Sequence, residues 1–314
     1  MTAYTKRLPK VTAVLCTAAL LAGCAAGTSD NTEPAATTAP VKAITIEPTA
    51  VYQTMNGFGA SACWWSQEVG NWENAKDILS LLYDENSGIG LNIYRYNLGA
   101  GSKDDATITD PDRRAEAFID KDGSYHWERD AAAQNALTLA KSMNKDLRVT
   151  LFSNSAPVFY TANGKAYCDY LPDDEKYVTN LEPERHADFA KYSIACAKHF
   201  TEAGYRVTGL SPINEPEWSW RGYEDGTAKQ EGCYYSKTQC RDLYKVFLKQ
   251  MAQEDALKDC RLEGWESGHI GTDTCMAYLK TLFGKSGVNW LKNGALRKGM
   301  PTLALHSYWA SPEE

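Results

Sequence analysis

The sequence predicts an α/β protein of the TIM (β/α)8-barrel type, and three observations support this fold class. First, short apolar segments typical of buried parallel strands alternate with longer segments of helical periodicity. Second, nearly every predicted strand is followed by polar or aromatic side chains, whereas a doubly wound sheet would gather them at one switch point. Third, the body from about Val41 onward holds roughly 270 residues, enough for a barrel of about 250.

The predicted strands share a short apolar stretch and a polar end, and lie at 55–61, 91–97, 147–153, 207–213, 261–265 and 303–306. Between them, apolar residues recur at helical spacing over 74–83, 130–143, 185–203, 236–255 and 274–283. A closed barrel needs eight strands, and an open parallel edge is prone to association. We therefore expect an incomplete barrel of about six βα units, and a sequence that is either a fragment or in need of a further segment.

The first 24 residues have the pattern of an export signal. Positive residues precede the apolar run 11–21, which is too short to span a bilayer as a helix. The run ends in Leu21-Ala22-Gly23-Cys24, which resembles a bacterial lipobox with Cys24 as the lipidated residue; the alternative is a plain secretory signal. We expect an exported lipoprotein, at the cell surface or in the periplasm, that contacts the membrane only through a lipid anchor on Cys24.

The remaining chain divides by composition. Residues 25–40 are mostly Ala, Thr, Ser, Asn, Pro and Gly and predict a flexible linker. Residues 41–56 predict one or two strands, at 43–46 and 51–52, of an accessory β-sheet. Residues 57–314 form the predicted partial barrel. Seven cysteines lie outside the signal segment, and their number and spacing do not indicate a disulfide framework, so none is assigned.

The composition also limits the kinds of ligand and partner that we expect. The formal net charge is −7 and no basic stripe occurs, so a nucleic-acid partner is not expected. Nine Trp and eighteen Tyr in an acidic, exported protein suit an oligo- or polysaccharide ligand, although such rings are also ordinary core material. No His-Glu-x-x-His helix, Gly-x-Ser-x-Gly elbow or Walker loop occurs, and we expect a monomer without metal or cofactor.

Asn214 and Glu215 are the leading candidates for chemistry. They follow the strand at 207–213 and are enclosed by Pro212 and Pro216, which cannot continue a strand ladder. A carboxyl group held there beside an amide could act as a general acid next to a group that binds sugar hydroxyls. A surface turn is the alternative, because Asn, Glu and Pro are common turn residues.

The segment at 57–62 imitates a dinucleotide-binding fingerprint, but no helix is predicted to open directly after its glycines. Two tryptophans follow instead, Trp64 and Trp65. Glycines near a strand end bring the backbone close to a ligand, so at least one of these rings is a candidate for stacking on a sugar, with core packing as the alternative.

Five motifs occur in order: Gly57-Phe58-Gly59-Ala60-Ser61, Tyr94-Arg95-Tyr96-Asn97-Leu98-Gly99, Ser153-Asn154-Ser155-Ala156-Pro157, Ser211-Pro212-Ile213-Asn214-Glu215-Pro216 and His306-Ser307-Tyr308-Trp309. Together, over about residues 44–314, they resemble glycoside hydrolase family 30, a retaining family of clan A. The first and third motifs look most like its endo-β-1,6-galactanase-like branch. The resemblance implies a (β/α)8 barrel beside a β-sandwich.

The resemblance also implies roles for residues. Glu215 falls on the family's acid/base, and Asn214 on the residue that binds the sugar 2-hydroxyl. Arg95, His306 and Tyr308 match positions that line the catalytic subsite, and Asn97, Asn154, Trp64, Trp65 and Trp218 complete the candidate substrate-binding set. The family's nucleophile is a Glu at the end of strand seven, which would lie beyond Glu314, so we expect this stretch alone to be inactive.

Three alternatives stay open. Glu266, after the fifth strand, could be offered as the second carboxylate, although a role in a subsite or loop fits its adjacent strand position better. A surface lipoprotein that binds glycans without cleaving them would keep the same aromatic strand ends. A related activity, such as β-1,6-glucanase, xylanase or glucosylceramidase, would use the same motifs on a different glycan.

Overall fold

The computed structural model describes residues 47–172, 176–284, 289–299 and 302–308. The chain divides into two compact units, Met1–Thr54 and Met55–Glu314. The predicted signal, lipid anchor and linker, and the strand at 43–46, lie outside the described residues. Val51 and Tyr52 are exposed and lie outside any strand in the described residues, so the strand predicted there stays a prediction. A strand is stable only where a neighbour accepts its backbone hydrogen bonds.

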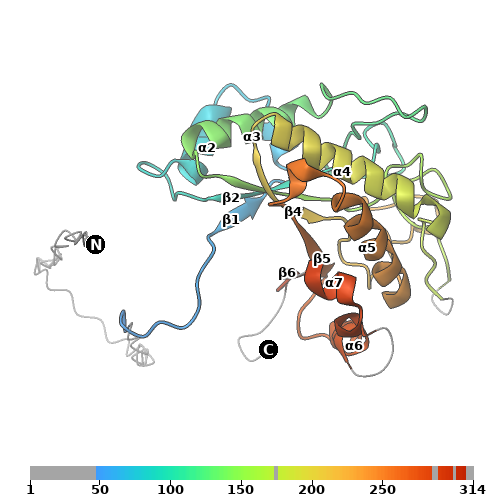
Figure 1. Cartoon of the computed structure of the whole chain (residues 1–314). Helices are drawn as coiled ribbons and strands as arrows, with labels where there is room; N and C mark the ends of the chain where they lie inside the picture. Colours follow the sequence, from blue (N-terminus) through green and yellow to red (C-terminus); the bar gives the residue numbers. More distant parts are fainter. Residues whose placement is uncertain (1–46, 173–175, 285–288, 300–301, 309–314) are drawn as a thin grey trace, which may run out of the picture. The chain divides into compact units, whose positions relative to one another are not determined.

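The second unit contains one parallel sheet in the order β1-β2-β3-β4-β5-β6 (Figure 1). This is six strands of a half-barrel, as the sequence predicted. The strands are β1 Gly59–Ser61, β2 Ile93–Asn97, β3 Arg148–Phe152, β4 Arg206–Ser211, β5 Arg261–Ser267 and β6 Thr302–Leu305.

Helices follow the strands along the chain and pack against the outside of the sheet (Figure 1). They are α1 Ser66–Val69, α2 Ala75–Tyr83, α3 Ala131–Met143, α4 His186–Glu202, α5 Lys237–Met251, α6 Asp273–Phe283 and α7 Gly294–Gly299. Four single 3-10 turns lie at Pro111–Arg113, Pro183–Arg185, Asp255–Leu257 and Trp290–Lys292. None of the helices in these described stretches has the length and apolar character needed to cross a membrane.

Two strands and two short helices differ from the sequence prediction. β1 is shorter than predicted because Gly57, with φ of +143°, leaves the extended conformation before Gly59 pairs with Ile93. β5 is longer and includes Glu266 and Ser267. The short helices α1 and α7 were not predicted, because four and six residues are too few to show helical periodicity.

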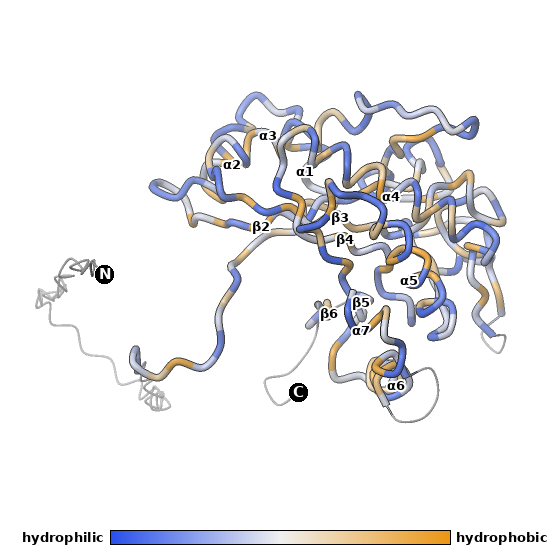
Figure 2. The backbone as a smooth tube through the Cα atoms, viewed as in Figure 1, coloured by the Kyte–Doolittle hydropathy of each residue, from blue (hydrophilic) through white to orange (hydrophobic). Residues whose placement is uncertain are grey.

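The alternation of side chains along β2 separates the core from the site. Tyr94 and Tyr96 are fully buried, and their rings lie 5.6 Å from Tyr83 of α2 and 5.0 Å from Phe200 of α4, respectively. Since successive side chains of a strand point to opposite faces, Arg95 projects toward the interior of the half-barrel. Figure 2 shows apolar and hydrophilic residues interspersed along the helices, as expected for helices with one buried face.

An irregularity in β5 places two carboxylates on the same side of the sheet. Glu263 accepts a hydrogen bond from Thr150 Oγ1 at 3.2 Å, and Glu266 contacts Arg95, whose register partner on β3 is Thr150. Residues three apart on a regular strand would face opposite ways, but the register of β5 against β6 shifts between Gly264 and Ser267. The shift turns Glu266 inward.

Candidate active site

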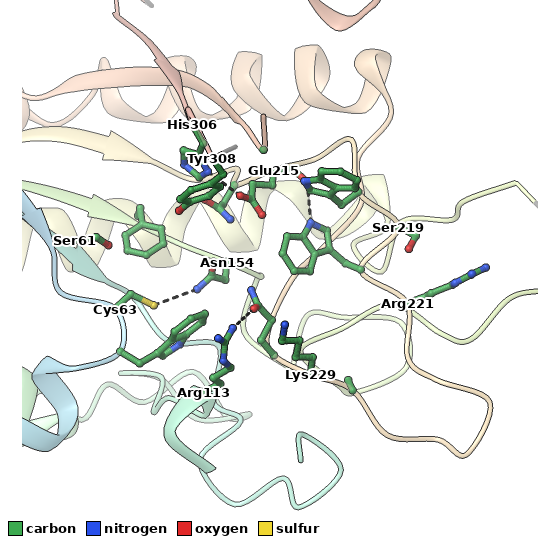
Figure 3. A pocket seen from close by; sticks show the side chains of 18 of the residues that line it. Ser61, Cys63, Arg113, Asn154, Glu215, Ser219, Arg221, Lys229, His306 and Tyr308 are labelled. Carbon is green, nitrogen blue, oxygen red and sulfur yellow. Dashed lines mark hydrogen bonds and ion pairs between the residues drawn. The ribbon is translucent and has the colours of Figure 1, made fainter. Parts of the chain in front are cut away.

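A pocket of about 630 Å³ opens at the carboxyl ends of the strands (Figure 3). Its walls come from the ends of β1 to β6 and from the long segments after β2 and β4. The lining residues are Ser61, Cys63, Trp64, Arg95, Arg113, Phe152, Asn154, Asn214, Glu215, Trp218, Ser219, Trp220, Arg221, Tyr223, Ala228, Lys229, Gln230, Gly268, His306 and Tyr308. Motifs from distant parts of the sequence therefore meet in one cavity, as the barrel prediction required.

Glu215 lies just past β4 with its backbone in a strained conformation. Its φ is +47°, in the left-handed region that non-glycine residues rarely adopt. Two contacts hold this geometry: Glu215 N donates to Glu266 O at 2.6 Å, and Trp220 Nε1 donates to Glu215 O at 2.8 Å. Such strain persists where surrounding contacts determine the backbone, and it clusters at functional sites.

The Glu215 carboxylate belongs to a network of alternating charges. His306 Nδ1 lies 2.7 Å from Glu215 Oε1, and His306 Nε2 lies 2.9 Å from Glu266 Oε2. Arg95 donates to the same Glu266 oxygen at 2.6 Å and to Asn214 Oδ1 at 3.1 Å. The buried Glu266 side chain is thus a counter-ion for both cations, and it fixes them against Asn214 and Glu215.

These contacts set the protonation of the network. Burial opposes a charge on His306, but the hydrogen bonds to Glu215 and Glu266 raise its pKa to about 9. Burial likewise opposes ionisation of Glu266, yet Arg95 and the hydrogen bond from His306 hold its pKa below the usual value. At neutral pH the site therefore contains an imidazolium between two carboxyl groups.

Arg95 is held on three sides. Its guanidinium carbon lies 3.1 Å from the centroid of the Phe152 ring, and it donates to Ser61 Oγ at 2.8 Å in addition to Glu266 and Asn214. A planar guanidinium that both stacks and donates in a fork cannot be replaced by Lys without losing contacts. The Asn214 amide is oriented in turn, because its oxygen accepts from Arg95.

Aromatic rings form much of the remaining wall, and several are exposed to the cavity. Trp218 and Tyr308 are about half exposed, at 45% and 53%, and Trp64 carries the Arg113 guanidinium 4.6 Å above its ring. Flat, partly exposed rings beside hydrogen-bonding groups are well suited to the apolar faces and hydroxyls of sugars. A Cβ at Gly268 would lie 1.9 Å from Trp218 Nε1, so this glycine allows the indole to sit against β5.

Most of the predicted site residues meet in the pocket, and two do not. Trp65 packs on the core, with its ring 6.4 Å from Tyr94 and its Nε1 donating to Ser61 O. Asn97 is buried away from the cavity and accepts from Asn154 Nδ2 at 3.3 Å, so it can orient Asn154 rather than bind substrate. Neither side chain lines the pocket, because burial by neighbouring elements cannot be read from position at a strand end.

Glu266 does not line the pocket, which agrees with the view that it is not a nucleophile.

The sequence reasoning missed Arg113, Phe152, Trp220 and Tyr223. Trp220 and Tyr223 belong to an aromatic-rich stretch that could have signalled them, whereas Arg113 carries no motif and reaches the cavity only through the fold. Within the described ranges, no three His, Cys, Asp or Glu side chains gather in a way that could hold a metal ion.

The sequence model of O-glycosyl hydrolase family 30 matches residues 41–310. The chain belongs to this family. An endo-β-1,6-galactanase of Hypocrea rufa is 30% identical over 218 residues, which cover 61% of this chain and 43% of that enzyme. An exo-β-1,6-galactobiohydrolase of Bifidobacterium longum subsp. longum is 27% identical over 242 residues, covering 57% of this chain and 16% of that enzyme.

Among solved structures, a conserved exported protein of Bacteroides fragilis superposes with a TM-score of 0.69 and 25% identity. The match covers 84% of this chain and 55% of that one. The chain therefore spans about half or less of the length of these similar proteins. The shared fold agrees with the half-barrel.

Proposed function

We propose that the whole protein hydrolyses a β-linked glycan with retention of configuration, that β-1,6-galactan is the substrate, and that Glu215 is the acid/base. The observation that carries this proposal is the Glu215 carboxyl group, held on strained backbone at the pocket by His306 and flanked by aromatic rings. The β-1,6-galactan specificity is supported by the names of the two curated relatives.

The geometry suggests how Glu215 works. His306 engages Oε1, and no described residue hydrogen bonds Oε2, which leaves that oxygen to protonate the leaving glycosidic oxygen. The Asn214 amide is oriented by Arg95 so that its NH₂ group can donate to a substrate hydroxyl. Retention requires a second carboxylate about 5–5.5 Å from Glu215 as nucleophile. We propose that another strand of the whole protein supplies it.

The test uses the protein expressed from its complete reading frame and its Glu215→Gln variant. On β-1,6-galactan we expect the variant to lose about 10²–10⁴-fold in kcat, the usual contribution of a general acid. On an aryl β-galactoside with an acidic phenol as leaving group, bond cleavage needs no protonation, so formation of the covalent intermediate should survive as a burst of phenol. Glu224→Gln, an exposed residue on the same segment, is the matched control and should be unaffected.

Two outcomes contradict this proposal. If Glu215→Gln loses activity on both substrates equally, or keeps full activity on both, Glu215 is not the acid/base. If the wild-type protein binds glycans by calorimetry but releases no reducing ends from β-1,6-galactan, β-1,6-glucan or xylan, the function is non-catalytic glycan binding. Cleavage of β-1,6-glucan alone, or of xylan alone, would assign β-1,6-glucanase or xylanase activity instead.

We also propose export and anchoring through a lipid on Cys24, with the protein acting as a monomer. The Leu21-Ala22-Gly23-Cys24 motif supports the anchor, and the exported relative of Bacteroides fragilis supports export. Wild-type protein should partition into detergent with the membrane fraction, and Cys24→Ala should not. Light scattering of the Cys24→Ala protein should give the mass of one chain.

A further inference from the structure

The segments that follow β3 and β4 interlock around Cys168. Cys168 N donates to Trp220 O at 2.9 Å, and Gly222 N donates back to Cys168 O at 2.8 Å. A second pass of the β4 segment runs alongside, since Gly232 N donates to Ala166 O at 2.8 Å. Cys168 therefore lies between two passes of the segment that forms one wall of the pocket.

The second pass brings Cys233 next to Cys168. Tyr234 N donates to Cys168 Sγ at 3.4 Å, which places that sulfur against the backbone that directly follows Cys233. Both cysteines are buried, with exposed fractions of 2% and 0%. The Thr179 hydroxyl lies 3.7 Å from Cys233 Sγ. Two sulfurs from segments far apart in sequence thus share one small, closed space.

The two thiols also interact with each other. Burial opposes ionisation of Cys233, but hydrogen bonds from the Cys168 thiol and neighbouring donors lower its pKa to about 7. The same hydrogen bond, together with burial, raises the pKa of Cys168 well above its usual value. The two pKa values shift in opposite directions because the two thiols share one hydrogen bond. By contrast, burial raises the pKa of Cys63, Cys196 and Cys260.

We propose that Cys168 and Cys233 form a disulfide in the exported protein, a covalent modification that joins the β3 and β4 segments. The oxidant is a disulfide-bonded thiol oxidoreductase of the oxidising compartment. The thiolate of one of the two cysteines attacks one sulfur of that disulfide and releases the other as a thiol. The thiol of the second cysteine then loses its proton and attacks the sulfur of the first, which releases the oxidoreductase as a dithiol. The protein gives up two electrons and two protons, and exchange precedes closure of the segments over the sulfurs.

The link would rigidify the pocket without touching the reacting groups. It would close the loop from residue 168 to residue 233, a stretch that includes β4, Glu215 and the pocket residues Trp218 to Gln230. Closing a long loop restricts the unfolded chain and so favours the native state. Because Cys168 already hydrogen bonds to the backbone at 220–222, the wall that carries Trp220 and Tyr223 would be tied to the β3 segment.

The test is a peptide map of the complete protein, recovered from the oxidising compartment. The protein is denatured in the presence of iodoacetamide, which alkylates free thiols, and is then digested without reductant. We expect a linked peptide pair containing Cys168 and Cys233, with the other five cysteines of the body alkylated. A sample denatured in dithiothreitol should show all seven alkylated. If Cys168 and Cys233 are alkylated before reduction, or if the linked pair contains a different cysteine, the proposal is wrong.

Variants supply a second measurement that does not depend on glycan hydrolysis. Dithiothreitol should lower the melting temperature of the wild type but not of the Cys168→Ala/Cys233→Ala double variant. A Cys240→Ala variant, buried but outside the pair, is the matched control and should respond as the wild type does. If dithiothreitol lowers the melting temperature of the double variant as much as that of the wild type, the disulfide is contradicted, even if the double variant is less stable.

Discussion

Replacement of Glu266 by Gln should move the titration of His306, because Glu266 is one of the two carboxylates that hold its proton. The pKa of His306 is raised from 6.5 to about 9, against the effect of burial. An opposite charge at hydrogen-bond distance changes a pKa by about 1–3. Glu266→Gln keeps the size of the side chain and removes the charge, so the pKa of His306 should fall by at least about 1.

The same contacts predict a dependence of stability on pH. The pKa of His306 is higher in the folded state, so its stabilisation is complete below pH 6.5 and is lost as the pH rises toward 9. One unit of pKa difference corresponds to about 1.4 kcal/mol, which gives an upper value of about 3 kcal/mol for this residue. Urea unfolding of the complete protein between pH 6 and 9.5 should show this loss in the wild type, and less of it in Glu266→Gln.

The assay is an NMR titration of the histidine rings. His186 and His199 are internal references, because burial lowers the pKa of both. His306 should therefore titrate at a higher pH than both references. Glu263→Gln is the matched control: Glu263 is on the same strand but hydrogen bonds Thr150. The reasoning is refuted if His306 titrates near 6.5 in the wild type, or if the Glu266 and Glu263 variants shift it equally.

Three further substitutions test the packing around the site in the complete protein. Ser236→Ala should cost about 1 kcal/mol in urea unfolding, because Ser236 and Gln239 form a capping box at α5; an unchanged midpoint would contradict this. Gly268→Ala should weaken oligosaccharide binding by calorimetry, because the added methyl group collides with the Trp218 indole; unchanged affinity would remove Trp218 from the binding surface. Phe247→Ala should cost about 3–5 kcal/mol in unfolding, because this fully buried ring leaves a cavity; a loss below about 1 kcal/mol would show that the site collapses.

The sequence by itself determined the alternation of strands and helices and the order of the strands. It did so because periodicity and strand-end chemistry are local properties of the chain. The same local signals pointed to Glu215, Asn214 and Arg95 at strand ends, and the parallel sheet then brought these ends to one edge. Arg113 shows the limit of these signals, since it carries no motif and reaches the pocket only through the fold.

Only the tertiary structure decided which strand-end side chains reach the pocket and which contact each other. The shift in β5 turns Glu266 toward Arg95 and His306, and a shift in register depends on neighbouring strands rather than on the residues themselves. Likewise, Cys168 and Cys233 meet because two long segments interlock through backbone hydrogen bonds. Contacts between residues far apart in sequence depend on the path of the whole chain, which no local pattern records.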